Sequence, residues 1–282
     1  MDRHSVDGQA RLVPASSLVP EALTDVFNLG FSGHLMPLQM DDAALREHIV
    51  VNDIDLDRSI VAVGAAPAGL VLTGCRGSEA WIGGMGVAPG SRRTGLGVRL
   101  MTAALRSAAG AGADAVWLEV LEANDAAIGL YEGLGFERER HLSIWSLPPA
   151  FREPGGHRVL GLDDAHAWIA THRGGREPWQ RADASLQHMQ ERGSPLSAVA
   201  VPNAGDVGGV AIVKSDGVTA TVIQLAAPDR ATARELLIAA AGAQTLRFSN
   251  VPSDHLFSAV LRELGADLVV AQHEMRRVLR TG

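Results

Sequence analysis

The stretch Trp81–Gly97, with the sequence WIGGMGVAPGSRRTGLG, decides how the rest of the chain is interpreted. Its apolar first half predicts a buried strand that passes through Val87 and ends at a proline. A loop with two arginines and two spaced glycines follows, and a helix is predicted from Val98 to Leu105. A glycine loop that opens a helix offers backbone N–H groups at the positive end of the helix dipole. The stretch therefore predicts a phosphate or pyrophosphate site, with an ordinary surface turn as the alternative.

A second informative stretch is Val116–Phe136, with the sequence VWLEVLEANDAAIGLYEGLGF. Its first five residues are mostly apolar and predict a short strand. Asn124 is a suitable helix cap, and the spacing after it predicts a helix over 126–134 that Gly135 ends. Tyr131, the one tyrosine of the chain, follows Asn124 by two helical turns. Both side chains can therefore lie on one face of this helix.

The two stretches, in this order, resemble the GNAT acetyltransferase superfamily. The resemblance rests on the loop Arg92-x-x-Gly95-x-Gly97 and on the strand–Asn–helix–Tyr–Leu-Gly-Phe unit after it, and it covers residues 10–147. It implies an α/β (α+β) fold in which helices flank a mixed, mostly antiparallel central sheet. It also implies that the protein is an enzyme, an acyltransferase that uses acetyl-coenzyme A.

The resemblance further implies which residues bind acetyl-coenzyme A. In the family, the glycine loop holds the pyrophosphate, the strand before it binds pantetheine and the thioester carbonyl, and the later helix lies near the sulfur. By position, these roles fall to Met85, Gly86, Val87, Arg92, Arg93, Thr94, Gly95, Leu96, Gly97, Val98, Asn124, Ala127 and Tyr131. Three glycines within Gly83–Gly86 also predict a β-bulge or a close backbone approach.

Two residues are candidates for the catalytic acid and base. By resemblance, Tyr131 is the general acid that protonates the coenzyme A thiolate, and a buried structural tyrosine is the alternative. Glu119, in a Leu-Glu-Val sequence, resembles the base of the ribosomal-protein N-terminal acetyltransferase branch. An exposed strand glutamate is the alternative there, and the base is left open among Glu119 and the reserve groups Glu122, Asp55 and His34.

The acceptor pocket is expected next to the two helices that precede the sheet. These helices are predicted over 16–29, with Ser16 or Ser17 as the cap, and over 41–50. Phe31, His34 and Met36 lie between them, and Trp81 begins the glycine-containing strand, so the resemblance makes them candidate substrate contacts. Simple packing onto the core is the alternative for the apolar residues.

The second half of the chain looks like a worn copy of the first. The sequences SAVAV (197–201), GVAI (209–212) and the run 220–228 follow one another as SIVAV (59–63), GLVL (69–72) and the run 80–89 do. The segment Asp229–Arg234 lacks spaced glycines, and Leu261 stands where Tyr131 stands in the first copy. We therefore predict an acetyltransferase domain over 1–147, a linker over 148–156 and a degenerate GNAT-like domain over 157–282.

Composition sets limits on the remaining interpretations. The chain has 282 residues, one cysteine and a formal net charge of −7. No apolar run reaches the length of a membrane span, and the N-terminus lacks a signal peptide, so we expect a cytoplasmic protein that binds neither membrane nor nucleic acid. No metal site is expected, and homodimer formation is left open.

The function expected from these observations is direct transfer of the acetyl group of acetyl-coenzyme A to a primary amine of a small molecule. An acetyltransferase of peptide or protein N-termini is one alternative. A non-catalytic acyl-coenzyme A-binding scaffold is another.

Overall fold

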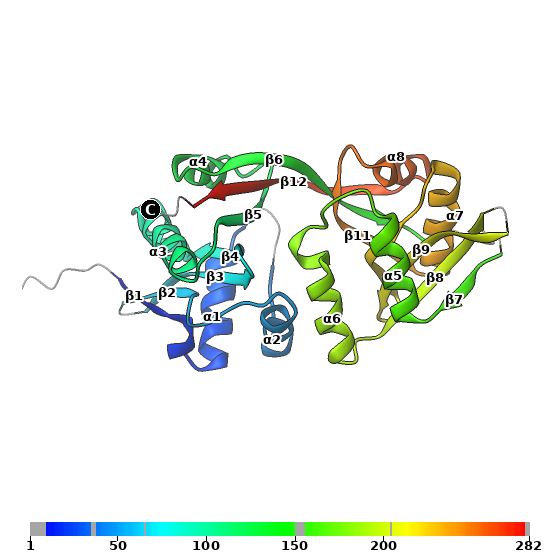
Figure 1. Ribbon diagram of the computed structural model, residues 1–282. Coiled ribbons are helices and arrows are strands. Elements are labelled where there is room, and N and C mark those ends of the chain that lie inside the picture. Colours follow the sequence, from blue (N-terminus) through cyan, green and yellow to red (C-terminus); the bar gives the residue numbers. More distant parts are fainter. Residues whose placement is uncertain (1–9, 35–37, 65, 150–155, 204, 280–282) are drawn as a thin grey trace, which may run out of the picture. The chain divides into compact units, whose positions relative to one another are not determined.

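A computed structural model describes residues 10–34, 38–64, 66–149, 156–203 and 205–279. Within these residues the chain contains twelve strands and eight α-helices (Figure 1). None of the described helices combines the length and apolar character that crossing a bilayer requires. Met36 and most of the predicted linker lie outside the described residues.

The chain divides into two compact units. Unit 1 contains the described residues up to Glu139 together with those from Glu274 onward, and unit 2 runs from Arg140 to His273. The sequence predicted that the first domain ends at residue 147. In the structure, the first unit ends earlier, at Glu139. The difference arises because strand β6 (Glu137–Leu147) and strand β12 (Asp267–Val278) each contribute residues to both units.

Unit 1 has the predicted order of elements. They are β1 (Arg11–Pro14), α1 (Pro20–Phe31), α2 (Asp42–Val51), β2 (Ile60–Val63), β3 (Pro67–Arg76), β4 (Glu79–Val87), α3 (Leu96–Gly110), β5 (Ala115–Leu121) and α4 (Asp125–Gly133). The first four strands pair antiparallel in sequence order, and β5 lies parallel to β4. The sheet is thus mixed and mostly antiparallel, as the sequence predicted.

Helices cover both faces of this sheet (Figure 1). Alternation along β3 explains how: Val71 packs with α3, whereas Leu70 and Leu72 point to the face that α1 covers. The α1 helix approaches β4 so closely that a Cβ on Gly86 would lie 2.8 Å from the carbonyl carbon of Gly30. Because only glycines fit at this crossing, α1 is fixed directly over the strand that leads to the loop.

Unit 2 repeats this topology. Its elements are β7 (Arg158–Leu160), α5 (Leu162–His172), α6 (Asp183–Glu191), β8 (Leu196–Asn203), β9 (Asp206–Ser215), β10 (Thr219–Ala226), α7 (Arg230–Ala241), β11 (Thr245–Pro252) and α8 (Leu256–Glu263). Strands β7 to β10 pair antiparallel, and β11 lies parallel to β10 and antiparallel to β6. The three predicted sequence echoes fall in β8, β9 and β10, so the predicted repeat is confirmed.

The first helix begins later than the sequence predicted. Residues 15–17 form a short 3₁₀ turn, and α1 starts at Pro20 with no side-chain cap. The Ser17 hydroxyl instead donates to the Pro14 carbonyl at 2.7 Å. Proline at the first helical position needs no N–H partner and has a helical φ, so it replaces the predicted serine cap. The second helix begins at Asp42, one residue later than predicted, and is capped by Asp41, whose side chain accepts from the Ala44 N–H.

Candidate active site

The sheet of unit 1 opens between β4 and β5. These parallel strands are paired over three residues each, and Trp81 with Trp117 is the last pair. Both strands continue beyond this point, β4 as far as Val87. Backbone N–H and C=O groups need partners, so the edge of β4 that contains Met85 and Gly86 offers donors and acceptors to an extended ligand. The opening is where the sequence placed the pantetheine contacts.

A β-bulge at Gly83 marks the start of this opening. Leu72 of β3 pairs with Gly84 and Thr73 pairs with Ile82, which leaves Gly83 as the extra residue. A Cβ at Gly83 would lie 2.5 Å from Cζ3 of Trp81. The predicted bulge is therefore present, and glycine is required there because the indole covers the backbone.

The carbonyl of Gly83 is bound by a histidine that sequence reasoning missed. His48 of α2 places Nε2 3.0 Å from this oxygen, and its Nδ1 lies 3.2 Å from Nδ2 of Asn52. An amide NH₂ group only donates, so Nδ1 accepts and Nε2 carries the proton that is donated to Gly83. Burial lowers the pKa of His48, which keeps the ring neutral. A single histidine within a helical pattern gives no sequence signal for such a contact.

Trp81 and Glu119 are brought together across the opening strands. The Trp81 indole is 2% exposed, and its Nε1 donates to Oε2 of Glu119 at 2.8 Å. A matching bond joins Trp117 to Glu79 at 3.0 Å. The indole therefore fixes the orientation of the Glu119 carboxylate. Trp81, predicted to contact the acceptor, and Glu119, the candidate base, therefore lie on the same face of the sheet.

The loop before α3 has the geometry of an anion site. Gly95 is the N-cap residue of α3 with φ of 83°, and no side chain caps the helix. Arg93, with φ of 66°, and Thr94 are exposed beside it, and the Thr94 hydroxyl donates to the Ser91 carbonyl at 2.8 Å. A positive φ favours glycine at position 95, and an uncapped helix start leaves its N–H groups available to an anion.

The first turn of α3 packs closely against the opening. A Cβ at Gly97 would lie 3.1 Å from Cε of Met85 and 3.4 Å from Cδ2 of Leu130. Leu96 is buried and anchors the turn, whereas Val98 is exposed. Glycine at position 97 thus lets the first turn of α3 lie close to the side chain of Met85 on β4.

Arg92 has a role that sequence reasoning did not predict. Its Nε donates to the Val87 carbonyl at 2.9 Å, and its Nη2 donates to the Ser32 carbonyl at 2.6 Å. These bonds tie the loop to the end of β4 and to the end of α1. Arg92 therefore holds the loop in place, in addition to any contact with phosphate.

The α4 helix places Asn124 and Tyr131 on the other face of the sheet. Oδ1 of Asn124 accepts from the Ala127 N–H at 3.2 Å, so the asparagine is a helix cap. Tyr131 packs edge-on against Phe136 with ring centroids 5.9 Å apart. Burial raises its pKa to about 12, and among the described residues its hydroxyl has no hydrogen-bond partner. The buried tyrosine thus keeps its proton at neutral pH.

Phe31 and His34 lie at the end of α1, on the same face as Trp81. Phe31 stacks on Phe27 with centroids 4.5 Å apart, and a Cβ on Gly84 would lie 3.7 Å from its ring. The His34 ring lies 5.5 Å from that of Phe31, and burial, followed by the charge of Arg92, lowers its pKa. Phe31 therefore combines core packing with a position over the glycine strand.

The predicted site residues thus fall into two groups on opposite faces. Trp81, Glu119 and Phe31 lie on the face covered by α1 and α2, whereas Tyr131 packs in the core that α3 and α4 share. The opening between β4 and β5 connects the two faces. Such an arrangement can receive a cosubstrate on one side and an acceptor on the other.

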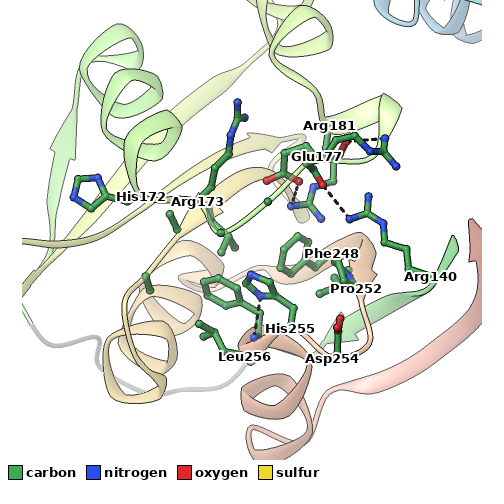
Figure 2. A pocket seen from close by; sticks show the side chains of 18 of the residues that line it. Arg140, His172, Arg173, Glu177, Arg181, Phe248, Pro252, Asp254, His255 and Leu256 are labelled. Carbon is green, nitrogen blue, oxygen red and sulfur yellow. Dashed lines mark hydrogen bonds and ion pairs between the residues drawn. The ribbon is translucent and has the colours of Figure 1, made fainter. Parts of the chain in front are cut away.

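Unit 2 has a counterpart of this opening. Strands β10 and β11 are paired only as far as Val222 with Phe248, and the register with β9 makes Ile223 the bulged residue. A cavity of about 480 Å³ lies at the end of β10, with Phe248 and His255 among its lining residues (Figure 2). Unit 2 therefore retains the shape of the opening although its sequence differs.

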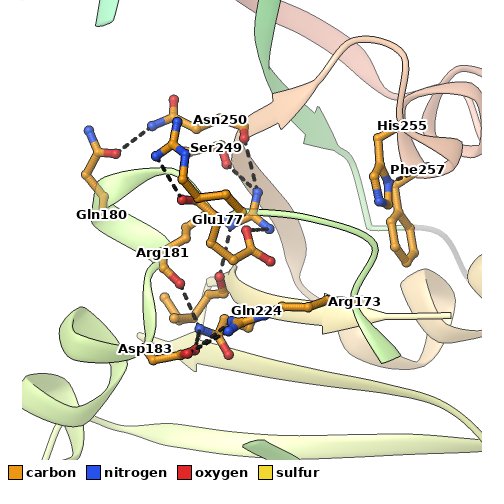
Figure 3. A network of polar contacts seen from close by, with 12 residues as sticks. Arg173, Glu177, Gln180, Arg181, Asp183, Gln224, Ser249, Asn250, His255 and Phe257 are labelled. Carbon is orange, nitrogen blue, oxygen red and sulfur yellow. Dashed lines mark hydrogen bonds and ion pairs between the residues drawn. The ribbon is translucent and has the colours of Figure 1, made fainter. Parts of the chain in front are cut away.

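A buried arginine donates hydrogen bonds to the backbone carbonyls of that opening (Figure 3). Arg181 is 6% exposed, and its guanidinium donates to the carbonyls of Ile223 at 3.0 Å and of Ser249 and Asn250 at 3.2 Å each. Its Nη2 pairs with Glu177 at 2.8 Å. The chain itself thus binds the carbonyls that an extended ligand would use.

The helices α7 and α8 of unit 2 lack the glycine loop and the tyrosine that their counterparts in unit 1 contain. At the start of α7, the Asp229 carboxylate accepts from the Thr232 N–H at 2.8 Å, so an anionic cap takes the place of the glycine loop. On α8, Leu261 is 1% exposed in the core and cannot donate a proton. The start of α7 and the position of Leu261 thus differ in chemistry from their counterparts in unit 1.

The family comparison agrees with this geometry. The model of the Acetyltransferase (GNAT) family matches residues 21–136, which span α1 to the end of α4. These residues are therefore a GNAT acetyltransferase domain, and unit 2 lies outside the match. The comparison with curated proteins finds no match.

Solved structures share the fold of the whole chain. A GCN5-related N-acetyltransferase from Sphaerobacter thermophilus is 17% identical, with a TM-score of 0.70 over 97% of this chain and 96% of that one. A tandem GNAT protein of the clavulanic acid biosynthesis pathway is 15% identical, with a TM-score of 0.66 over 97% and 100%. A third, from Kribbella flavida, is 20% identical, with a TM-score of 0.58 over 98% and 72%. The chain therefore has the tandem GNAT fold.

Proposed function

We propose that unit 1 transfers the acetyl group of acetyl-coenzyme A to a primary amine of a small molecule. The observation that carries this proposal is the opening between β4 and β5. It leads from the uncapped start of α3 past the Met85–Val87 edge, and it joins the Tyr131 face of the sheet to the Glu119 face. A cosubstrate site and an acceptor site are thereby placed on either side of one strand edge.

The residues present fit acetyl-coenzyme A. Gly95 and Gly97 leave space at the loop that any Cβ would reduce, and the first N–H groups of α3 face an anion without a competing side-chain cap. The charge of Arg93 lies beside them. Acetyl-coenzyme A would supply the acetyl group as a reactive thioester. The loop would bind its phosphates, and the edge Met85–Val87 would orient the extended arm.

Tyr131 is the proton donor of this proposal. Its pKa of about 12 keeps the hydroxyl protonated at neutral pH. An ordinary thiol has a pKa of about 8.5, so complete proton transfer from this hydroxyl to a thiolate would be uphill by roughly 5 kcal/mol. The hydroxyl would therefore first donate a hydrogen bond to the departing sulfur. Once the hydroxyl has given its proton to the sulfur, the proton that the attacking amine loses restores the tyrosine, by way of Glu119 or solvent, so that the enzyme ends in its starting protonation state.

Glu119 is the candidate that receives this proton. The Trp81 N–H orients one carboxylate oxygen at 2.8 Å on the face where α1 and α2 end. A carboxylate acts there either on the amine or on a water between them. The formal charge of −7 favours a cationic acceptor. Peptide N-termini are the second candidate acceptors, because Glu119 also has the Leu-Glu-Val context described above.

The experiment that tests the proposal compares wild type with Tyr131→Phe. Acetyl-coenzyme A binding is measured by calorimetry, and acetyl transfer is measured on a panel of small amines and N-terminal peptides. The expected result is unchanged binding and transfer slowed by about a hundredfold, the usual contribution of an acid or base. Normal turnover by Tyr131→Phe would remove the tyrosine from the mechanism.

A second pair of variants separates catalysis from binding. Gly95→Glu places a carboxylate at the anion site, whereas Gly110→Glu places one at the opposite end of α3, where a side chain meets open space. Acetyl-coenzyme A should bind to Gly110→Glu and not to Gly95→Glu. Absence of binding by the wild type would favour a scaffold without cosubstrate.

A further inference from the structure

The cavity of unit 2 has the size of a small-molecule site. Its volume of about 480 Å³ lies within the range of roughly 300–1,000 Å³ that ligand pockets occupy. The cavity lies at the counterpart of the unit 1 opening, but Arg181 already binds the carbonyls of Ile223, Ser249 and Asn250. A pantetheine arm therefore has no free strand edge of this kind to bind.

Phosphate groups also lack a site beside this cavity. The carboxylate of Asp229 caps α7 and would repel an anion at the helix start. The segment after it contains no glycine before Gly242. The ligand of the cavity is thus of a different class from the cosubstrate of unit 1.

Aromatic rings form one side of the cavity (Figure 2). Phe248 and Phe257 lie edge to face with centroids 6.2 Å apart, and the His255 ring stacks on Phe257 at 5.2 Å. Leu225 and Leu256 extend the apolar lining. A ligand with a flat or apolar body can bury that body here.

Positive charge lines the rest of the cavity. Four arginines, Arg140, Arg173, Arg176 and Arg181, and two carboxylates, Glu177 and Asp254, are among its lining residues. Arg181 is held by Glu177, and both Nη atoms of Arg173 bind Asp183 at 2.6 Å. The charges of Arg181 and Arg173 are thus balanced by carboxylates. Arg140 and Arg176 complete the basic side, and Nη1 of Arg140 donates to the Arg176 carbonyl at 3.0 Å, which orders this side before a ligand arrives.

His255 adds a neutral donor to this lining. Its Nδ1 accepts from the Phe257 N–H at 3.4 Å, which leaves the proton on Nε2. Burial and the nearby charge of Arg181 lower the pKa of the ring, so His255 stays uncharged near neutral pH. A neutral N–H beside guanidinium groups suits a carboxylate oxygen.

From these features we propose that the cavity of unit 2 binds a small carboxylate with an aromatic or apolar body. The apolar body lies on Phe248 and Phe257, and the carboxylate faces the side lined by Arg140 and Arg176. This site is separate from the cosubstrate site of unit 1, and its existence does not depend on acetyl transfer.

The test uses the full chain and isothermal titration calorimetry. The probes are phenylacetate, its neutral analogue phenylacetamide, octanoate, phenyl phosphate and acetyl-coenzyme A. We expect saturable one-to-one binding of at least one carboxylate, at least tenfold tighter than that of phenylacetamide. Arg176→Gln should weaken this binding at least tenfold, and Leu256→Trp, which fills the apolar side, should abolish it.

Matched controls make the test decisive. Arg192→Gln removes an exposed arginine of unit 2 outside the cavity and should bind like wild type. Tyr131→Phe should also bind the carboxylate normally, which separates this proposal from the proposed function. The assignment is overturned if neither carboxylate binds, if phenylacetamide binds equally well, or if Arg192→Gln weakens binding as Arg176→Gln does. It is equally overturned if phenyl phosphate or acetyl-coenzyme A binds more tightly and loses that binding in Arg176→Gln.

Discussion

Replacing Glu177 with glutamine should destabilise unit 2 far more than an ordinary surface change. The side chains of Arg181 and Glu177 are 8% and 11% exposed, and the other partners of the guanidinium are neutral carbonyls. Glu177→Gln would leave a buried positive charge without its counter-ion, a change that costs about 3–5 kcal/mol. Glutamine still accepts a hydrogen bond from Nη2, so we expect the lower end, about 3 kcal/mol of unfolding free energy.

Differential scanning calorimetry and urea unfolding measure this loss. For a unit of this size, about 3 kcal/mol corresponds to a fall in Tm of roughly 10 °C. Glu263→Gln is the matched control, because Glu263 pairs with Arg230 at the surface, with side-chain exposures of 50% and 66%. Surface pairs contribute about 0–1 kcal/mol, so the control should change little. A loss below about 1 kcal/mol for Glu177→Gln would refute the view that Arg181 is held as a buried charge.

Three further changes test other parts of the molecule. His48→Ala removes the donor to the buried Gly83 carbonyl, so unfolding free energy should fall by at least about 1–3 kcal/mol in urea titrations and acetyl transfer should slow in parallel. Gly97→Val should raise the Kd for acetyl-coenzyme A at least tenfold by calorimetry, because even its Cβ meets Met85 at 3.1 Å. The Asp183 carboxyl has a pKa well below its usual value, chiefly through Arg173, so its stabilisation is present above about pH 4 and is lost as pH falls further. Tm measured from pH 7 to pH 3 should therefore fall more steeply for wild type than for Asp183→Asn.

The fold followed from the sequence wherever local signals were strong. Glycines at Gly83–Gly86 predicted the bulge, and the repeated strand patterns predicted the topology of unit 2. The boundary between the units was less accessible, because β6 and β12 look like ordinary strands and only their partners show that each serves both units. The start of α1 was misjudged because serine caps and an N-terminal proline give competing signals, and the proline decided the outcome.

The site was predictable only in part. The positive φ at Gly95 favours glycine, and Asn124 caps α4 with its side-chain oxygen, so both features follow from residue type. The bond from Trp81 to Glu119 joins residues 38 positions apart, and it depends on a strand register that sequence spacing does not reveal. His48 and Arg181 were missed for the same reason, since each acts on a strand that is distant in sequence.

The bulge carbonyls of the two units show how one fold supports two different sites. In unit 1, Gly83 accepts from the neutral ring of His48, which binds one carbonyl and leaves the edge from Met85 onward without a β5 partner. In unit 2, Ile223 accepts from Arg181, whose guanidinium reaches two more carbonyls on β11. A histidine donates once at this position, whereas an arginine fork donates to both strands and closes the gap. The side chain that binds the bulge carbonyl thus decides whether the neighbouring strand edge stays open, as in unit 1, or is bridged, as in unit 2.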